Sequence, residues 1–392
     1  MRIVGVVSEY NPFHKGHAWH LSQARQLSGA DYVVAVMSSC FTQRGEAACL
    51  SPRDRAETAL RCGADAVIAL PAFWAVRDAE HFALGGVSLI HGMGADAVSF
   101  GAETADEQLL RRAAALLELP DEAFCAAVQR HLAAGKPHPA AVAAAAQERS
   151  PELGALLQSP NNTLAVCYLR AMYRLRAELD VYPVARAGDY HATSLTEGVL
   201  PSATALRGCM QRGDWANAVS GMPAEAQPVV TSAALDGRIH RQGALDQALL
   251  YRLRTMTGEE WRHLPGLSEG IEDRLRDAAQ KASTREELLA LAKTRRYPHA
   301  RLSRLCAHAL LHITQDMLDE TPLPPAAWLL GLRDGAQPLL SHISKHMPLI
   351  SKASAVQTDE AWFRTECLAY DLWALGCGQP AGLAMTQGVV RV

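Results

Sequence analysis

Short apolar runs alternate with amphipathic helical segments over the first hundred residues of the chain. The runs cover residues 3–7, 32–37, 66–70 and 97–100, and each is apolar at successive positions. Strands buried on both faces of a parallel sheet have this pattern, and the spacing of the runs fits one strand–helix–strand unit each. The sequence therefore predicts a doubly wound α/β fold with a parallel, Rossmann-like sheet.

Two helix starts are marked by capping residues. Ser51-Pro52 followed by Asp54 is typical of a helix N-terminus, and Gly63 fits the end of that helix. The stretch 104–107, in which Thr104 precedes two acids, predicts another helix that starts at the threonine. These signals place helices between the predicted strands, as the α/β fold requires.

The remainder of the chain reads as mostly helical. An alanine-rich helical insertion is expected at about 105–180, after which Tyr182–Ala185 returns the chain to the sheet. Further helices are predicted from apolar spacing at Glu269–Ala282, Thr284–Lys293 and Arg301–Thr314. We expect an α/β domain over 1–220 and a mostly helical C-terminal domain over 221–392. The proline-rich stretch 321–325 predicts a break before a last, smaller unit.

Composition narrows the class of protein without naming a ligand. The hydrophobic content of 49% and the charged content of 20% are ordinary for a soluble globular protein, and no run reaches the roughly 20 apolar residues of a membrane span. The net charge of -3 does not indicate indiscriminate nucleic-acid binding, although a basic patch on one face is compatible with it. Nine cysteines without a Cys-x-x-Cys pair argue against a zinc site. We expect a cytoplasmic protein that does not bind membranes.

Candidate chemistry lies directly after the first strand. Asn11-Pro12 indicates a turn, and His14-Lys15-Gly16-His17 then leads into a helix. The free N–H groups of a helix N-terminus favour an anion, and ligands of open α/β sheets bind beyond the carboxyl ends of the strands. Nucleotide phosphates fit this place, with His14 and His17 as donors to the α-phosphate. The alternative is that the histidines only cap the helix or bind a metal.

The sequence around this turn resembles a known family. A strand followed by His-x-Gly-His and a helix is the signature of the nucleotidyltransferase superfamily, and the longer string Glu9–His17 resembles the bacterial tRNA(Met) cytidine acetate ligase family. Further strings match that family in order: Phe41-x-Gln43-Arg44-Gly45, Gly63-Ala64-Asp65, Phe100-Gly101-x-Glu103, Ser159-Pro160-Asn161-Asn162, Ser202–Arg207, Lys293-Thr294-x-Arg296-Tyr297 with Arg301, and Leu330-Gly331-Leu332 with Gly335. The resemblance therefore spans nearly the whole chain.

The resemblance implies a two-step reaction. Members of the family condense acetate with ATP to acetyl-adenylate, and then pass the acetyl group to the wobble cytidine of elongator tRNA(Met). ATP, acetate and elongator tRNA(Met) are thus the expected ligands and partners, Mg²⁺ is inferred from the ATP chemistry, and no stable protein partner is implied. The residues by themselves support only nucleotide binding with attack at phosphorus.

Site residues follow from the motif and the family match together. The catalytic candidates are His14, His17 and Arg207. The ATP-binding candidates are Val7, Asn11, Pro12, Phe13, His14, Gly16, His17, His20, Gly101, Asn162, Arg186, Ser202 and Thr204. Ser202 has the alternative of being only a helix N-cap, and Arg186 that of a surface ion pair. Arg207 is expected to stabilise the pyrophosphate leaving group.

A basic segment in the C-terminal part is the candidate RNA contact. The tRNA-binding candidates are Arg44, Lys293, Arg295, Arg296, Arg301 and Arg304. Tyr297 and His299 are interleaved with them, and cations with aromatic rings are suited to an RNA backbone and an unstacked base. The alternative is the solvated face of a helix. Arg44 fits either the acetyl-adenylate or the tRNA.

Several departures from the family pattern and two other functions stay open. Lys15, Ser39-Cys40 and Cys167 stand where the family usually has other residues, which puts the detailed loop geometry and the acetate pocket in question. A small-molecule nucleotidyltransferase of the NAD or coenzyme A pathways is the first alternative, and the long helical part argues against it. The second is a nucleotide-sensing RNA-binding protein without catalysis, against which the intact His14, His17 and Arg207 count.

Overall fold

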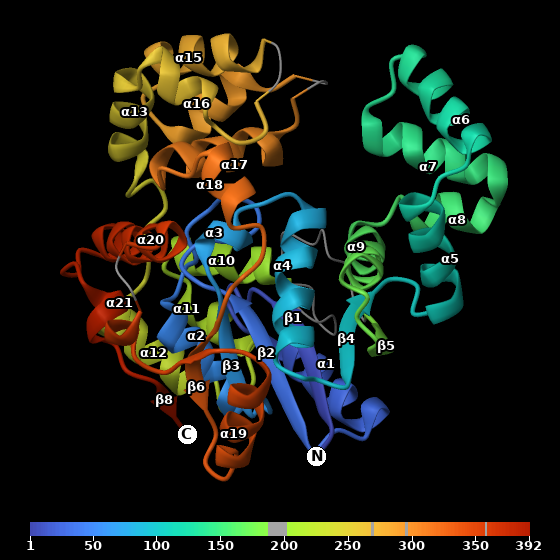
Figure 1. Ribbon diagram of the computed structural model, residues 1–392. Helices are drawn as coiled ribbons and strands as arrows, with labels where there is room; N and C mark the ends of the chain where they lie inside the picture. Colours follow the sequence, from blue (N-terminus) through green and yellow to red (C-terminus); the bar gives the residue numbers. More distant parts are fainter. Residues whose placement is uncertain (187–201, 268–269, 295–296, 357–358) are drawn as a thin grey trace.

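A computed structural model describes residues 1–186, 202–267, 270–294, 297–356 and 359–392 (Figure 1). Five parallel strands follow the predicted apolar runs and lie side by side in the order β5-β4-β1-β2-β3. Their bounds are β1 Ile3–Ser8, β2 Tyr32–Ser38, β3 Ala66–Leu70, β4 Ala97–Ala102 and β5 Asp180–Ala185. The predicted α/β fold with a mostly parallel sheet is confirmed.

The C-terminal segment extends this sheet. Strand β6, Ala327–Leu332, pairs with β3 in antiparallel fashion, and β7 (Leu349–Ile350) and β8 (Val390–Arg391) each pair with β6. The expectation of a separate last unit after the proline-rich stretch is therefore wrong. The physical reason is visible in β6, which is apolar and buried at every position and so fits the edge of the parallel sheet. The division of the chain at residue 220 stays a prediction.

Helices cover the sheet on both faces. Those of the first hundred residues are α1 Lys15–Ser28, α2 Pro52–Arg61, α3 Ala72–Ala75 and α4 Ala79–Gly92. Ser51 caps α2 as predicted, because its Oγ accepts a hydrogen bond from the Asp54 amide at 2.9 Å. Helix α5 begins at Glu107 and not at Thr104. Its cap is Asp106, whose carboxylate accepts from the Leu109 amide at 3.0 Å.

The predicted helical insertion forms a separate group of helices, seen at the upper right of Figure 1. It consists of α5 Glu107–Glu118, α6 Glu122–Ala133, α7 His138–Arg149, α8 Pro151–Leu156 and α9 Pro160–Leu175. Helix α9 packs along α4, and Arg170 and Arg174 on α9 both form ion pairs with Glu80 and Glu118. The pairs with Glu80 fix α9 against α4 of the α/β core, and the pairs with Glu118 fix it against α5.

A second helical group lies at the upper left of Figure 1 and has its own apolar core around Trp261. Its helices are α13 Asp246–Thr255, α14 Gly258–Arg262, α15 Ile271–Lys281, α16 Arg285–Ala292 and α17 His299–Leu310. Helix α17 thus begins two residues before and ends four residues before the predicted bounds. The C-terminal half of the chain also forms α10 Ala203–Gln211, α11 Trp215–Ser220, α12 Gln227–Leu235, α18 Gln315–Glu320, α19 Gln337–His346, α20 Ala361–Cys377 and α21 Leu383–Thr386.

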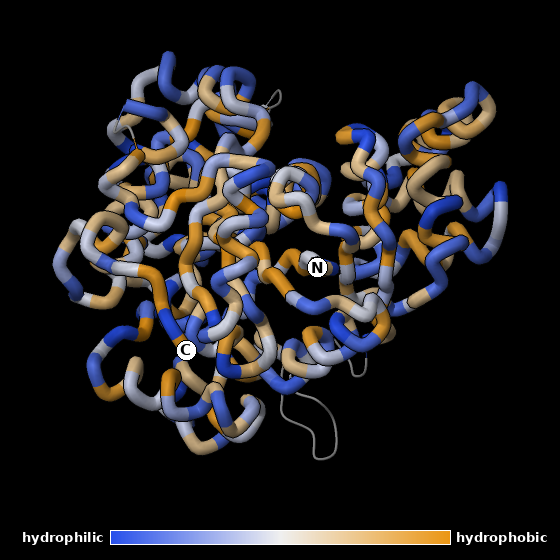
Figure 2. The backbone as a smooth tube through the Cα atoms, turned by 60° about the horizontal axis from the view of Figure 1, so that its bottom comes forward, coloured by the Kyte–Doolittle hydropathy of each residue, from blue (hydrophilic) through white to orange (hydrophobic). Residues whose placement is uncertain are grey.

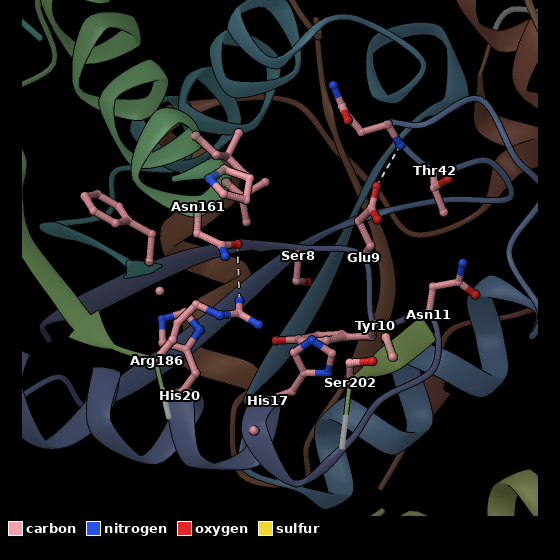
Figure 3. Close-up of a pocket in the computed structure, with 18 of the residues that line it drawn as sticks. Ser8, Glu9, Tyr10, Asn11, His17, His20, Thr42, Asn161, Arg186 and Ser202 are labelled. Atoms are coloured by element: carbon pink, nitrogen blue, oxygen red, sulfur yellow. Dashed lines mark hydrogen bonds between the residues drawn. The ribbon is translucent and has the colours of Figure 1, made fainter. Parts of the chain in front are cut away.

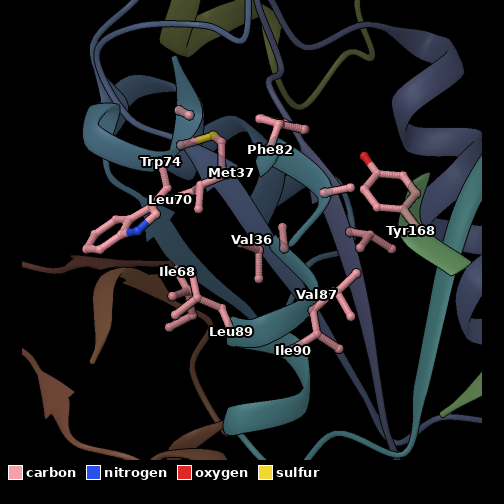
Figure 4. Packing of buried hydrophobic residues seen from close by; sticks show 14 of the residues in the cluster. Val36, Met37, Ile68, Leu70, Trp74, Phe82, Val87, Leu89, Ile90 and Tyr168 are labelled. Atoms are coloured by element: carbon pink, nitrogen blue, oxygen red, sulfur yellow. The ribbon is translucent and has the colours of Figure 1, made fainter. Parts of the chain in front are cut away.

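The main core lies between the sheet and α4, where Val36, Ile68 and Leu89 pack together (Figure 4). Glycines allow α4 to lie close to β1, since a Cβ atom at Gly86 would meet the Val7 side chain at 2.7 Å. Figure 2 colours the backbone by the hydropathy of each residue. Hydrophobic segments lie in the central strands, and many of the outer loops are hydrophilic. No helix in the described part of the chain combines the length and the apolar character of a membrane span.

Candidate nucleotide site

One pocket of about 350 Å³ opens at the carboxyl ends of the strands (Figure 3). The N-terminal ends of α1 and α10 border it on one side, and residues from α9 and β5 on another. It is lined by Val7, Ser8, Glu9, Tyr10, Asn11, His14, Gly16, His17, Trp19, His20, Thr42, Gln43, Arg44, Glu46, Ala79, Phe82, Phe100, Gly101, Pro160, Asn161, Leu164, Tyr168, Val184, Ala185, Arg186, Ser202, Ala203, Thr204 and Arg207. Most of the predicted nucleotide-binding residues are therefore brought together here.

Two histidines form a reciprocal cap at the start of α1. The Gly16 amide donates to His14 Nδ1 at 3.0 Å, and the His14 amide donates to His17 Nδ1 at 3.2 Å. The two rings stack with their centroids 3.7 Å apart. Because both Nδ1 atoms accept hydrogen bonds, the proton of each neutral ring is on Nε2. Each imidazole therefore acts as cap and still offers one N–H donor.

The histidines of the pocket are neutral in the folded protein. Burial lowers the pKa of His14 to about 3 and that of His20 to about 4, and it holds the pKa of His17 well below 6.5. The positive charge of Arg186 lowers all three values further. His20 is hydrogen-bonded to Ser99 Oγ at 3.1 Å. Neutral N–H donors beside an arginine and helix N-termini suit an anionic ligand, and the histidines themselves form no ion pair with it.

A second helix N-terminus faces the same pocket. Ser202 caps α10 by accepting from the Ala205 amide at 3.1 Å. Arg207, one turn into α10, donates to the Asn11 carbonyl at 2.5 Å and to Thr204 Oγ1 at 3.1 Å. The arginine thus connects the α10 end to the turn before His14. Two helix N-termini and an arginine that converge on one pocket favour a polyanion.

Arg186 and α9 form the side of the pocket seen at the left of Figure 3. Arg186 donates to Asn161 Oδ1 at 3.4 Å, and a Cβ at Gly101 would lie 3.2 Å from the Arg186 Cγ. Asn162 is 1% exposed and lies outside the pocket lining, because its Oδ1 accepts from the Thr104 amide at 2.9 Å. Its neighbour Asn161 lines the pocket in its place. The role of Asn162 at the nucleotide stays a prediction.

Glu103 holds the two asparagines at the start of α9. Its carboxylate accepts from the Asn162 amide at 2.8 Å and from Asn161 Nδ2 at 2.6 Å. Glu103 therefore serves α9 and not α5, the next helix in the sequence. The pair of adjacent asparagines is thus divided between two tasks, with one amide group turned to the pocket and the other to the β4–α5 loop.

The remaining predicted ATP contacts lie behind the pocket wall. Phe13 is fully buried and packs against Tyr10 and His17, and Pro12 follows Asn11 in a cis peptide bond. Neither residue is among those that line the pocket. Their side chains support the turn before His14 and do not face the cavity. Whether their backbone contacts a nucleotide stays a prediction.

Arg55 is a structural residue of the site that the sequence did not identify. It is fully buried, and its guanidinium donates to the carbonyls of Leu50 and Glu9 at 3.1 and 2.7 Å, to that of Ser38 at 2.9 Å, and to that of Ser39. The ends of β1 and β2 and the loop after β2 are thereby held by one side chain. Its segment, PRDRAETALR, reads as a polar helix, so no local signal indicates the burial.

The departures from the family pattern lie around this arginine, at the surface and inside α9. Ser39 and Cys40 are fully buried, and the Ser39 carbonyl is one of the acceptors of Arg55. Lys15 is exposed and outside the pocket lining. Cys167 is buried within α9, at 8% exposure. Of these positions none lines the pocket, so its walls consist of other residues.

The predicted RNA contacts do not form one uniform surface. Arg295 and Arg296 lie outside the described residues. Lys293 is exposed, and Arg301 donates to the Gly266 carbonyl at 2.7 Å. Arg304, in the middle of α17, is half-buried, and burial lowers the pKa of its guanidinium.

One aromatic residue expected at the RNA surface is buried instead. Tyr297 is 5% exposed and belongs to the apolar core of the second helical group. The expectation that it is available to a base is therefore wrong, because its ring fills space between helices. The neighbouring His299 is exposed. Sequence spacing alone does not distinguish these two positions.

Arg44 links the pocket to the second helical group. This residue lines the pocket, and its carbonyl accepts a hydrogen bond from Ser303 Oγ on α17. The next residue, Gly45, has φ +75°, and its carbonyl accepts from Arg285 Nη2 at 3.2 Å. The loop after β2 is thus attached to α17 on one side and forms a wall of the cavity on the other.

These features together define a nucleotide-binding α/β protein. Residues 1–382 match the model of a family described as HIGH Nucleotidyl Transferase. A tRNA(Met) cytidine acetate ligase of Geobacillus sp. is 34% identical over 92% of this chain and 91% of that protein, and the one of Bacillus subtilis is 34% identical over 91% and 88%. The chain therefore belongs to the HIGH nucleotidyl transferase family and, within it, to the tRNA(Met) cytidine acetate ligases.

Solved structures agree with this placement. Thermotoga maritima TmcAL bound with alpha-thio ATP has a TM-score of 0.90 to this chain, and the apo form has one of 0.92. In both comparisons the sequences are 26% identical and each chain is covered completely. The likeness thus includes both helical groups as well as the sheet.

Proposed function

We propose that this protein activates acetate with ATP as acetyl-adenylate and transfers the acetyl group to the wobble cytidine of elongator tRNA(Met). The observation that carries the proposal is the pair of Nε2–H donors of His14 and His17 at a helix N-terminus in the pocket. The names of the relatives and the ATP analogue bound to the Thermotoga protein support the choice of substrates.

The first step places the triphosphate between the two helix N-termini. His14 and His17 donate to the α-phosphate, where negative charge develops as an acetate oxygen attacks phosphorus. Arg207 and the α10 end with Ser202 and Thr204 receive the pyrophosphate that leaves. Arg186, Gly101 and Asn161 hold the nucleoside side of ATP. The neutral state of both histidines leaves them as donors throughout, so they stabilise charge and are not proton acceptors.

The second step brings the tRNA to the other end of the pocket. We propose that the second helical group, with Lys293, Arg301 and Arg304 and the segment that includes Arg295 and Arg296, binds the tRNA backbone. Arg44 is at the junction, since it lines the pocket and its carbonyl is bound to α17. An anticodon base that enters beside α17 would meet the acetyl-adenylate there.

The proposed reaction uses Mg²⁺ that is bound to the phosphates of ATP. Among the described residues no group of three or more His, Cys, Asp or Glu side chains is arranged to hold a metal ion. Protein sites for Mg²⁺ on nucleotides usually supply only one or two ligands, and the phosphates supply others. The residues therefore fit an ion that arrives on the phosphates of ATP and not one held in a cage of its own.

The test is a reconstituted reaction with defined substrates. The protein is incubated with ATP, Mg²⁺, ¹⁴C-acetate and an unmodified elongator tRNA(Met) transcript, and the label in the wobble nucleoside is measured. We expect labelling that requires ATP and acetate, with release of pyrophosphate. A transcript with uridine at the wobble position is the matched control and should stay unlabelled. Labelling that required acetyl-CoA in place of ATP and acetate would contradict the proposal.

A further inference from the structure

Acetyl transfer to a cytidine amine requires a group that accepts a proton. The exocyclic amine attacks the acetyl carbonyl carbon, and the nitrogen must then lose a proton as the bond to AMP breaks. Among the described residues that line the pocket, the titratable side chains are Glu9, Tyr10, His14, His17, His20, Arg44, Glu46, Tyr168, Arg186 and Arg207. The geometry and charge of each decide which of them can accept that proton.

Most of these side chains are excluded by their hydrogen bonds or charge. His14 and His17 have their lone pairs on Nδ1, and both are occupied by backbone amides. Burial raises the pKa of Tyr10 and of Tyr168 far above 10, so both phenols stay protonated. Arginine has no acceptor atom. Glu9, Glu46 and His20 are left. His20 is hydrogen-bonded to Ser99 and lies next to Arg186 in Figure 3, at the end of the pocket where the nucleoside is proposed to bind.

The two carboxylates differ in where they lie. Glu46 is the fourth residue of the loop segment that begins at Gln43, and it faces Arg285 of the second helical group at 3.8 Å. Glu9 follows the end of β1 directly, inside the pocket, and its Oε1 accepts from the Gln43 amide at 2.6 Å. No hydrogen-bond donor in the described part of the chain is paired with the other oxygen, Oε2. Figure 3 shows the Glu9 carboxylate between the loop and the cavity, away from His20 and Arg186.

We infer that Glu9 is the proton acceptor of the acetyl-transfer step. The inference rests on the proposed function. The cytidine amine nitrogen forms a bond to the acetyl carbonyl carbon, and the carbon–oxygen bond to AMP breaks with its electron pair on AMP. The proton from the amine goes to Glu9 Oε2. The products are the N-acetylated cytidine, AMP and protonated Glu9, which returns its proton to solvent.

The surroundings of Glu9 suit this task. Burial raises the pKa of the Glu9 carboxyl, and the Gln43 amide and the charges of Arg44, Arg207 and Arg55 oppose that rise. A carboxylate with a raised pKa is a stronger base than one in water, and the three arginines favour its charged form beside the polyanionic ligand. Glu9 also lies at the Arg44 end of the pocket, where the loop meets α17 and the tRNA is proposed to enter.

The experiment separates the two half-reactions in the Glu9→Gln variant. Gln43 can still donate to the amide oxygen at position 9, so the loop is retained. Acetate-dependent exchange of pyrophosphate into ATP reports adenylate formation, and a single turnover of preformed enzyme–acetyl-adenylate with tRNA reports transfer. We expect exchange close to the wild-type rate and transfer slowed by a factor on the order of 10² or more. Glu57→Gln on α2, which is outside the pocket lining, is the matched control, and it should leave both half-reactions unchanged.

Each other outcome has a definite meaning. If Glu9→Gln lowers exchange and transfer equally, Glu9 shapes the pocket and the inference is wrong. Transfer at the wild-type rate in that variant would also overturn it. If the glutamine variant does not fold by circular dichroism, Glu9→Asp provides the test, since it keeps a carboxylate and should lose transfer more than exchange. If the wild-type protein shows no acetate-dependent exchange, the proposed function itself is contradicted. That result differs from every outcome for the Glu9 variants, which presuppose exchange in the wild type.

Discussion

The imidazole rings of His14 and His17 stack at a centroid distance of 3.7 Å, and the Nδ1 of each ring accepts a hydrogen bond from a backbone amide. The same rings therefore do two things: they cap α1 and they present Nε2–H to the pocket. Because one ring has both roles, a substitution can be chosen that removes the Nε2–H donor and retains the helix cap.

The first prediction concerns His14→Asn. The asparagine Oδ1 occupies nearly the place of Nδ1 and can accept from the Gly16 amide, whereas no donor replaces Nε2–H. We expect the free energy of unfolding to stay within about 1 kcal/mol of the wild type, because the cap is retained. Acetate-dependent pyrophosphate exchange should fall by a factor on the order of 10². His14→Gln, which places a donor near the Nε2 position but loses the cap, is the matched control, and exchange at the wild-type rate in His14→Asn would contradict the phosphate role.

The second prediction concerns Gly16→Ala. A Cβ at this position would lie 2.9 Å from Cε1 of the His14 ring, so the ring must move. Alanine in a helix is otherwise favoured over glycine by roughly 1 kcal/mol. We therefore expect unchanged or slightly higher thermal stability together with lower exchange activity. Gly208→Ala on α10 is the control, since its Cβ would meet only the end of the Arg212 side chain at 3.2 Å. Equal activity in both variants would show that the ring position is not critical.

How much of this site is predictable depends on how local each signal is. The apolar runs predicted β1 to β5, and the turn before His14 and the cap at Ser202 were found because their residues are adjacent in sequence. Strand β6 is also apolar at successive positions, but it lies in the part of the chain that is predicted to be mostly helical. Local chemistry therefore predicts both helix N-termini that face the pocket.

The features that were missed depend on contacts between distant segments. Arg55 lies in a polar helix, and only the fold brings four carbonyls from β1, β2 and the following loop to its guanidinium. The different contacts of Asn161 and Asn162 depend on Thr104 and Glu103, which are 58 and 59 residues before Asn162. Tyr297 has the sequence surroundings of a surface residue and the packing of a core residue. None of these properties has a signature within a window of ten residues.

The third prediction concerns Glu366, a fully buried carboxyl on α20. Burial raises its pKa to about 7, and its Oε2 accepts from the Ala72 amide at 2.6 Å. Because the folded-state pKa lies above the ordinary 4.5, the stability contribution is complete below about pH 4.5 and is lost as the pH rises through 7. Glu366→Gln can still accept from Ala72, so we expect it to be more stable than the wild type at pH 8 by roughly 1–3 kcal/mol.

Urea unfolding at pH 5 and pH 8 checks this expectation. The difference between Glu366→Gln and the wild type should shrink at pH 5, where the folded wild type also carries a neutral side chain. Glu57→Gln, which changes an exposed pair with Arg61 on α2, is the control and should show little change at either pH. A stability difference of the same size at both pH values would contradict a pKa near 7 for Glu366.

The last prediction tests the attachment of the pocket loop to α17. Gly45 has φ +75°, and a Cβ there would lie 2.7 Å from the Ser303 carbonyl oxygen and 2.8 Å from the Arg304 Cα. Gly45→Ala must therefore push the loop away from α17, and Arg44 with it. If tRNA on the second helical group reaches the pocket past this loop, acetylation of tRNA should fall by at least tenfold while pyrophosphate exchange falls less. A tenfold loss corresponds to about 1.4 kcal/mol.

Gly335→Ala is the matched control, because Gly335 has φ +87° and a Cβ there would meet nothing within 4 Å. It carries the same backbone strain of roughly 1–2 kcal/mol without the clash. Equal losses of exchange and acetylation in Gly45→Ala, or equal behaviour of the two variants, would show that the contact with α17 supports the fold and does not align the tRNA with the pocket.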